Sequence, residues 1–221
     1  ILDTSNYVNT NSVKPDMQLG LLQVSNLLCS YINEPSAVEA NVKLGIFNTR
    51  MGKIDINNLY FLVKSLQLNN SDIAIIKGKA AIDSLVQATP VNAAPTATIW
   101  HINIDATALH NNFFRYDDQQ EKPVTNALDY NHLFLQNVDF VANKLHLSPQ
   151  GYTGIITKLS FNEKSGFGIR QFNAGFSYSD TAAALNNFYL NTGKSVLKDN
   201  INISYPSIEA IKVSPATLFV D

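Results

Sequence analysis

Apolar residues recur along the chain in a short pattern: two in alternation, a polar pair, then two more in alternation. Copies with this spacing lie at 22–29, 54–61, 133–140, 167–174 and 183–190. On a helix these positions scatter around the axis and form no stripe. On a strand, each half of the pattern presents one apolar face. The pattern therefore predicts a protein built from β-strands.

The polar pair in the middle of each copy determines how the two halves are related. An odd step along a strand moves the second half to the opposite face unless a bulge or a two-residue hairpin turn intervenes. A bulge is favoured at 136–137 and 170–171, because Arg-Gln is poor turn chemistry. For the Asn-Asn pairs at 57–58 and 186–187 both solutions stay open, since Asn tolerates positive φ. In every case the repeated unit is bent.

The chain divides into four segments. Residues 1–20 form an extended lead-in, 21–79 a first β block, 80–98 a loop rich in Ala and Pro, and 99–221 a second β block that continues into a longer parent protein. Because strand follows strand without long helices between them, we expect a mainly β fold with an elongated, curved and mostly antiparallel sheet. The two blocks form either two lobes or one continuous sheet.

Turn-forming residues set the expected strand boundaries. Strands are expected at 21–31, 37–47, 53–63, 65–76, 130–147, 152–161, 167–178, 183–190 and 196–205, with a further one starting at Thr98. A turn is expected at 48–52, and helix is limited to short turns at 80–86 and 207–213.

Composition excludes several classes of protein. Net charge is −2 and no basic run exists, which argues against nucleic-acid binding. The chain contains 26 Asn, an excess suited to turns and bulges.

The single cysteine, Cys29, occupies an apolar position and is expected to be a buried thiol. No stretch of about 18 apolar residues is present. Both ends resemble strands, so the chain is interpreted as an excised piece whose edges, at 1–7 or 217–221, self-associate.

Catalytic and metal-binding patterns are absent from the sequence. The four histidines (His101, His110, His132 and His146) lack metal-ligand spacing and are interpreted as surface or strand-packing residues. No nucleophile motif or phosphate loop is present. We expect a protein that is not an enzyme and needs no metal or cofactor.

The apolar stripe is the remaining functional feature. It fills the core of a sandwich, or it lines a groove on the concave face of a single bent sheet, which suits acyl chains or apolar polypeptide segments. The candidate groove residues are Ile54, Ile56, Leu133, Leu135, Ile155, Leu159, Phe161, Phe167, Ile169, Phe172, Phe176 and Phe188.

Three stretches, Asp-Tyr-Asn-His-Leu at 129–133, the segment 159–167 with its Glu-Lys-Ser-Gly turn, and 185–195, resemble the AsmA-like superfamily. Within this superfamily the chain looks like the TamB-type translocation and assembly module proteins of Bacteroidota. This resemblance implies a periplasmic β-taco, an elongated U-shaped sheet with an apolar interior, in a protein anchored in the inner membrane. It also implies phospholipid acyl chains as cargo and support of outer-membrane protein assembly through parts outside this chain.

Two other classes of function stay open. One is a cell-surface adhesin or glycan-binding β-sandwich, for which Trp100 would be the best aromatic platform. The other is a structural spacer in a large envelope protein.

Overall fold

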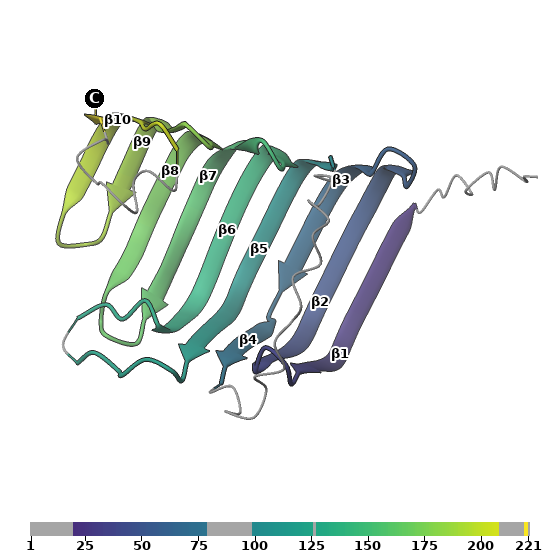
Figure 1. Ribbon diagram of the computed structural model, residues 1–221, viewed down its shortest axis with the longest axis horizontal. Coiled ribbons are helices and arrows are strands. Elements are labelled where there is room, and N and C mark those ends of the chain that lie inside the picture. The colour runs from purple at the N-terminus through teal and green to yellow at the C-terminus, as the bar shows by residue number, and fades with distance from the viewer. Residues whose placement is uncertain (1–19, 79–98, 126, 208–218, 221) are drawn as a thin grey trace, which may run out of the picture.

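The computed structural model describes residues 20–78, 99–125, 127–207 and 219–220. These residues form one 11-stranded sheet, and no helix occurs among them (Figure 1). The described part therefore holds no helix long and apolar enough to cross a membrane. The predicted mainly β fold with a curved sheet is confirmed.

The strands follow one another closely in the chain. They are β1 (Leu21–Asn33), β2 (Val38–Asp55), β3 (Tyr60–Asn69), β4 (Asp72–Lys77), β5 (His101–Asp118), β6 (His132–Ser148), β7 (Gly151–Glu163), β8 (Gly168–Ser179), β9 (Ala182–Asn191), β10 (Val196–Ser204) and β11 (Phe219–Val220).

The two β blocks belong to one continuous sheet, not to two lobes. β1, β2 and β3 form an antiparallel meander, and β5 to β11 form a second one. β3 and β4 act as a single interrupted strand, because both pair with β2 on one side and with β5 on the other. Their pairing with β5 is parallel, which the sequence did not predict. This seam joins the two antiparallel blocks.

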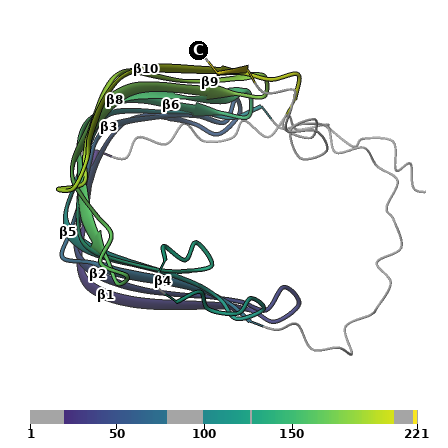
Figure 2. The same ribbon diagram turned by 90° about the vertical axis from the view of Figure 1, so that its left-hand side faces the viewer.

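The sheet is bent twice into a U (Figure 2). In β5 we define the upper arm as residues 101–105, the wall as 106–110 and the lower arm as 111–118. At about 3.3 Å per residue, the five wall residues span roughly 16 Å. β4 lies in the lower arm, and the hairpins between β2 and β3, between β6 and β7 and between β8 and β9 end the upper arm.

Asparagines with positive φ form the corner between the wall and the lower arm. Asn26, Asn70, Asn111 and Asn137 have φ values of 54°, 51°, 52° and 51°. Asn is one of the few residues that adopts this left-handed region at low cost. The side-chain amide of Asn111 on β5 donates to Oδ1 of Asn70, which lies between β3 and β4, at 2.8 Å. The Asn excess thus has a structural role, and the bulge predicted at 136–137 is confirmed.

A buried asparagine closes the gap between β3 and β4 at this corner. Asn112 is completely buried; its Oδ1 accepts the backbone N–H of Ser71 at 3.0 Å and its Nδ2 donates to the Leu68 carbonyl at 2.8 Å. The Ser71 hydroxyl in turn accepts the backbone N–H of Gly45 at 3.0 Å. Side chains therefore satisfy the backbone groups that the bend removes from the ladder.

The other polar pairs resolve in different ways. The register shifts next to 170–171 and 186–187, where Asn187 has a φ of 49°, so both pairs are bulges. The pair at 57–58 is instead a hairpin turn. Asp55 stabilises this turn by accepting the backbone N–H and the side-chain amide of Asn58 at 3.1 and 3.0 Å.

Three predicted elements in the first block are wrong. The strand expected at 65–76 is two strands, because β3 runs from Tyr60 to Asn69 and β4 begins at Asp72. The turn expected at 48–52 lies inside β2, where Gly52 sits at a register shift opposite Leu62 and the strand continues. The strand expected at 53–63 is broken by the hairpin turn at 56–59. The Arg-Met-Gly sequence at 50–52 suggested a turn. The positive φ typical of a turn is found instead at Leu59, with a φ of 48°. The expected helical turns at 80–86 and 207–213, and the expected edges at 1–7 and 217–221, lie outside the described residues or at their limits.

β1 is one exposed edge of the described sheet; the other is β10, which β11 covers at Ile203 and Ser204. Among the described strands β1 pairs with β2 alone, and it contains no charged residue or proline to discourage further pairing. Apolar side chains are exposed on both of its faces, including Leu27 at 45% and Leu28 at 74%.

We expect Leu28→Lys to reduce self-association of the protein, because a charged edge disfavours strand pairing. Light scattering over a wide concentration range measures the effect. Ile155→Lys is the matched control, since Ile155 is exposed on an interior strand. If the unmodified protein is monomeric throughout, edge pairing through β1 does not occur.

Candidate functional site

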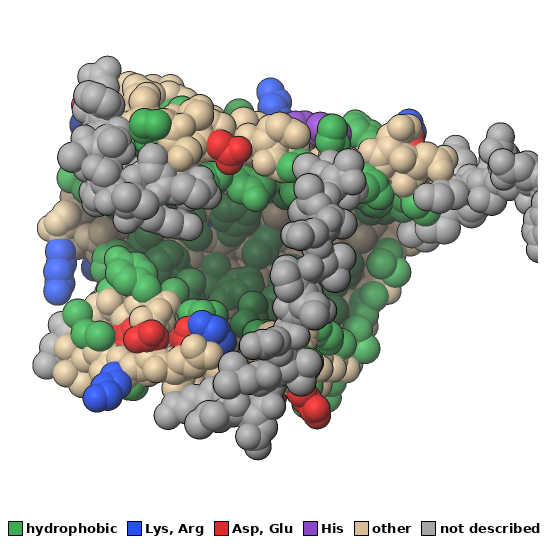
Figure 3. Space-filling model, in the orientation of Figure 1, with side chains coloured by type: hydrophobic (Ala, Val, Ile, Leu, Met, Phe, Trp, Pro, Cys, Tyr) green, Lys and Arg blue, Asp and Glu red, His purple; other side chains and the backbone are tan. Residues whose placement is uncertain are grey.

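The two faces of the sheet differ in chemistry. Figure 3 shows that the hollow of the U is lined mainly by hydrophobic side chains. Alternation along the strands and the register between them assign each side chain to this concave face or to the convex one. At every bulged polar pair, the pair points outward and the apolar residues on both sides of it stay on the concave face.

A continuous apolar row runs along the wall of the U. Each member is the direct register partner of the next, so the row crosses the sheet without interruption. We call it the wall row: Val24, Phe47, Leu68, Leu109, Phe140, Leu159, Phe172, Leu190 and Leu197. With strands about 4.8 Å apart, its length is roughly 38 Å.

Most concave side chains are only half-buried. The described residues that are both hydrophobic and buried are few, and they are spread along the sheet from β2 to the end of β10: Ile54, Val63, Leu68, Val138, Ala142, Ala174, Phe188 and Tyr205. A domain of this length with a closed core encloses most of its large apolar side chains. The described residues form a single layer, and no second layer of theirs covers the concave face.

The structure brings most of the predicted groove residues together on the concave face. Leu133 and Leu135 lie on the lower arm, and Phe161 contacts Phe167 near the lower corner with ring centroids 6.3 Å apart. The remaining members occupy the corners, the wall and the upper arm: Ile54, Leu159, Ile169, Phe172, Phe176 and Phe188.

Two predicted residues do not belong to this surface. Ile155 pairs with Asn143 and Gly175 and has the opposite orientation to Ile156, so it lies on the convex face, 42% exposed. A bulge at Thr157, between Ile156 and the wall, reverses the alternation that the sequence pattern assumed. Ile56 lies in the hairpin turn after β2, beyond the strand end.

Several ion pairs lie on the convex face, whereas Glu163, the register partner of Leu135, and the Lys77–Asp118 pair lie on the concave side of the lower arm. Lys64 pairs with Asp105 at 2.9 Å, and Asp139 pairs with Lys158 and with His110, each at 2.8 Å. In the described wall of β2, β3 and β5 to β9, by contrast, no charged side chain lies on the concave face. The polar groups on that part of the face are the hydroxyls of Thr49 and Thr107. The wall therefore offers an uncharged apolar surface.

The environment of Cys29 differs from the sequence-based expectation. Its thiol is exposed, not buried. The reason is its position on β1, where one neighbouring strand is present and the concave face is open.

Sequence reasoning missed much of the wall row. Leu68, Leu109 and Phe140 were not chosen as groove residues, although Leu109 is followed by an outward pair, His110-Asn111. The repeat around Leu109 does not show the apolar pattern, because two of its concave positions, Thr107 and Asn112, are polar. The doublets at 69–70 and 111–112 were the available signal for the bend.

Other chemistry is not visible in the described ranges: no cluster of His, Cys, Asp and Glu there could hold a metal ion. Comparison of the chain with known protein families, curated proteins and solved structures found no match. The groove itself is therefore the basis for assigning a function.

Proposed function

We propose that this chain is a non-enzymatic segment of a cell-envelope protein whose groove shields lipid acyl chains in transit between membranes. The observation that carries the proposal is the wall row, an unbroken apolar surface inside a single-layer U. Each acyl methylene removed from water against this surface contributes about 0.8 kcal/mol. The same burial stabilises the half-exposed side chains of the groove.

The chemistry of the groove favours acyl chains over polypeptide segments. A polypeptide carries one N–H and one C=O per residue, and each needs a hydrogen-bond partner when it leaves water. The backbone groups of the wall are already used in the ladder between strands. An acyl chain makes no such demand, so it fits a wall that offers few polar groups.

The setting of the function follows from the resemblance to TamB-type proteins. We propose that the parent protein resides in the periplasm, anchored in the inner membrane by a segment outside this chain. Contacts with the outer-membrane assembly machinery would also be made by parts outside it. A β-sandwich adhesin is less well supported, because both arms of the U belong to one sheet.

Native mass spectrometry of the purified 221-residue chain tests the proposal. We expect phospholipid or fatty acid to co-purify and to dissociate on activation in the gas phase. Reloading the delipidated protein from vesicles of mixed phosphatidylethanolamine and phosphatidylglycerol provides a second measurement. If no lipid co-purifies and none is taken up from vesicles, the lipid-groove proposal is wrong.

A further inference from the structure

The loop between β5 and β6, described at 119–125 and 127–131, is held in place from its two ends. The backbone N–H of Asp118 donates to the Asn131 carbonyl at 2.7 Å, and the N–H of Val124 donates to the Asp129 carboxylate at 2.8 Å. In Figure 1 this loop runs below the ends of β7 and β8, which stop short of β5 and β6. The loop therefore lies at the end of the lower arm, next to the shorter strands β7 and β8.

One histidine ties this loop to the sheet. His132 is buried, and both of its ring nitrogens face acceptors. Nδ1 lies 2.7 Å from Asp117 Oδ1, and Nε2 lies 3.2 Å from the Glu121 carbonyl oxygen. A carboxylate and a carbonyl can only accept, so both hydrogen bonds form only when both nitrogens carry a proton. The geometry thus selects the imidazolium, the positively charged form.

We propose that His132 is a pH-dependent latch, which holds the loop against the sheet when protonated and releases it at Glu121 when it loses its proton. The neutral ring keeps its stronger bond, from Nδ1–H to the Asp117 carboxylate. Nε2 then has a lone pair directed at the Glu121 carbonyl oxygen, so an attraction becomes a repulsion.

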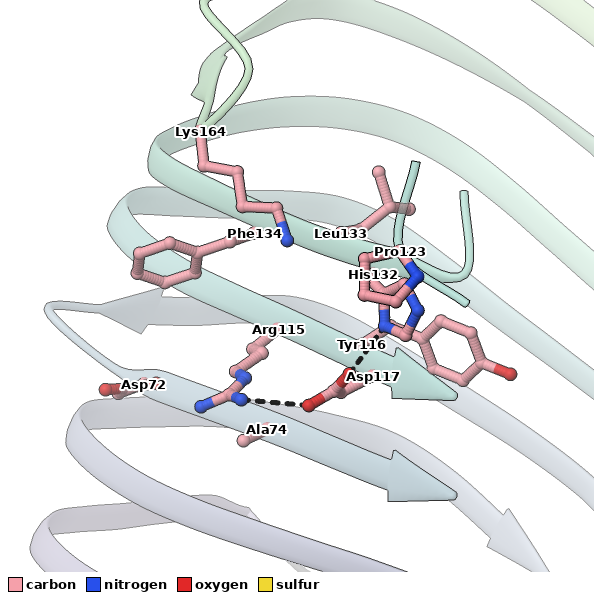
Figure 4. Close-up of a pocket in the computed structure, with 10 residues that line it drawn as sticks. All are labelled: Asp72, Ala74, Arg115, Tyr116, Asp117, Pro123, His132, Leu133, Phe134 and Lys164. Atoms are coloured by element: carbon pink, nitrogen blue, oxygen red, sulfur yellow. Dashed lines mark hydrogen bonds and ion pairs between the residues drawn. The ribbon is translucent and has the colours of Figure 1, made fainter. Parts of the chain in front are cut away.

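The charges around His132 support this assignment. Figure 4 shows Asp117 between His132 and Arg115, with an Arg115 Nη2 to Asp117 Oδ2 distance of 2.9 Å. These residues and Lys164 of the β7–β8 turn line a cavity of about 460 Å³. The hydrogen bond that His132 donates to Asp117 raises the pKa of His132 above its usual range, and the negative charge of Asp129 adds to the effect.

Each carboxylate around His132 has its own hydrogen-bond donor. Asp118 is paired with Lys77 of β4 at 2.8 Å, and this hydrogen bond holds the pKa of Asp118 below its usual range. The hydrogen bond from His132 lowers the pKa of Asp117 in the same way. Backbone hydrogen bonds from Val124 and Asn131 lower that of Asp129.

These shifts define a pH window for the latched loop. The raised pKa of His132 gives stability that is complete below about pH 6.5 and is lost as the pH rises through the folded-state value. The lowered pKa values of Asp117 and Asp129 give stability that is complete above about pH 4 and is lost as the pH falls further. The loop is therefore held most firmly in mildly acidic solution.

Release of the loop would change the lower end of the groove. Ala127 and Leu128 of the loop line a second cavity with Phe167 and Gly168 at the start of β8. Phe167 is also a groove residue, so the loop borders the concave face here. The consequence for cargo rests on the proposed function, whereas the latch itself does not depend on what the groove holds.

Two measurements on the lipid-free 221-residue chain test the latch together. NMR titration of the imidazole gives the pKa of His132, and hydrogen exchange gives the protection of the Val124 and Asn131 amides, corrected for intrinsic rates, from pH 5 to pH 9. We expect a raised pKa and a loss of protection that follows the same titration. The loss should be about tenfold for each unit by which that pKa is raised.

Two variants serve as controls. In Asp117→Asn the acceptor oxygen remains but its charge is lost, so the midpoint for loss of protection should move to lower pH. In His132→Gln the protection should no longer depend on pH in this range. An ordinary pKa for His132, or protection of the loop that is constant with pH in the unmodified protein, overturns the proposal. Neither result bears on lipid binding, which mass spectrometry tests separately.

Discussion

Asn112→Ala is expected to lower the free energy of unfolding by about 2–6 kcal/mol. The substitution leaves two buried backbone groups without partners, the N–H of Ser71 and the carbonyl of Leu68. Each such group costs about 1–3 kcal/mol. Because Asn112 is completely buried, water cannot replace its amide without opening the corner. Both lost hydrogen bonds connect β5 to the interrupted strand formed by β3 and β4, so the substitution weakens the parallel pairing between them.

Chemical denaturation monitored by circular dichroism measures this effect. Asn162→Ala is the matched control, because Asn162 is exposed at the same corner on β7. We expect the control to change stability by less than about 0.5 kcal/mol. Equal losses in the two variants would show that Asn112 has no special role in the bend.

Leu135→Asp is expected to abolish photo-crosslinking of the protein to a lipid with a diazirine in its acyl chain. Leu135 lies on the concave face of the lower arm, half-buried, where a carboxylate can stay hydrated in an open groove but cannot contact an acyl chain favourably. The matched control is Phe134→Asp, one residue away on the convex face. We expect the control to retain crosslinking.

Phe167→Glu provides an independent second test, with Ile155→Glu as its control on the convex face. Phe167 is 38% exposed, so the charged side chain can be accommodated without unfolding. In a closed core, either concave substitution would cost several kcal/mol and unfold the protein. Unfolding of both concave variants with folded controls would therefore favour a packed core over a groove.

The bend was predictable from the sequence because it depends on residues that are close together in the chain. The apolar residues on both sides of Gln136-Asn137 share a face only if the strand is bulged, and Asn137 has the required positive φ. The same reasoning placed Phe172 on the concave surface, whereas at 186–187, next to Phe188, a bulge and a turn both stayed open. The reasoning failed at Ile155, since the bulge that reverses the alternation involves Thr157, a residue that no local rule marks as a corner.

Features that depend on distant parts of the chain were not predictable. The parallel pairing of β3 and β4 with β5 brings together residues about 40 positions apart, such as Leu68 and Leu109. No periodicity encodes this contact. Likewise, the partners of His132 are an aspartate 15 residues away and a loop carbonyl. From the sequence alone, His132 could not be distinguished from a histidine that packs on a strand.

The wall row also governs how the protein should come apart. Each strand contacts mainly the strands beside it, as in a repeat protein, where stability is a sum of terms for units and their interfaces. Unfolding can then begin at either end of the row and proceed strand by strand, instead of in one cooperative step. By the same logic, a hairpin such as β7–β8 could be gained or lost in evolution with little change to the cross-section, so that groove length and groove width vary independently.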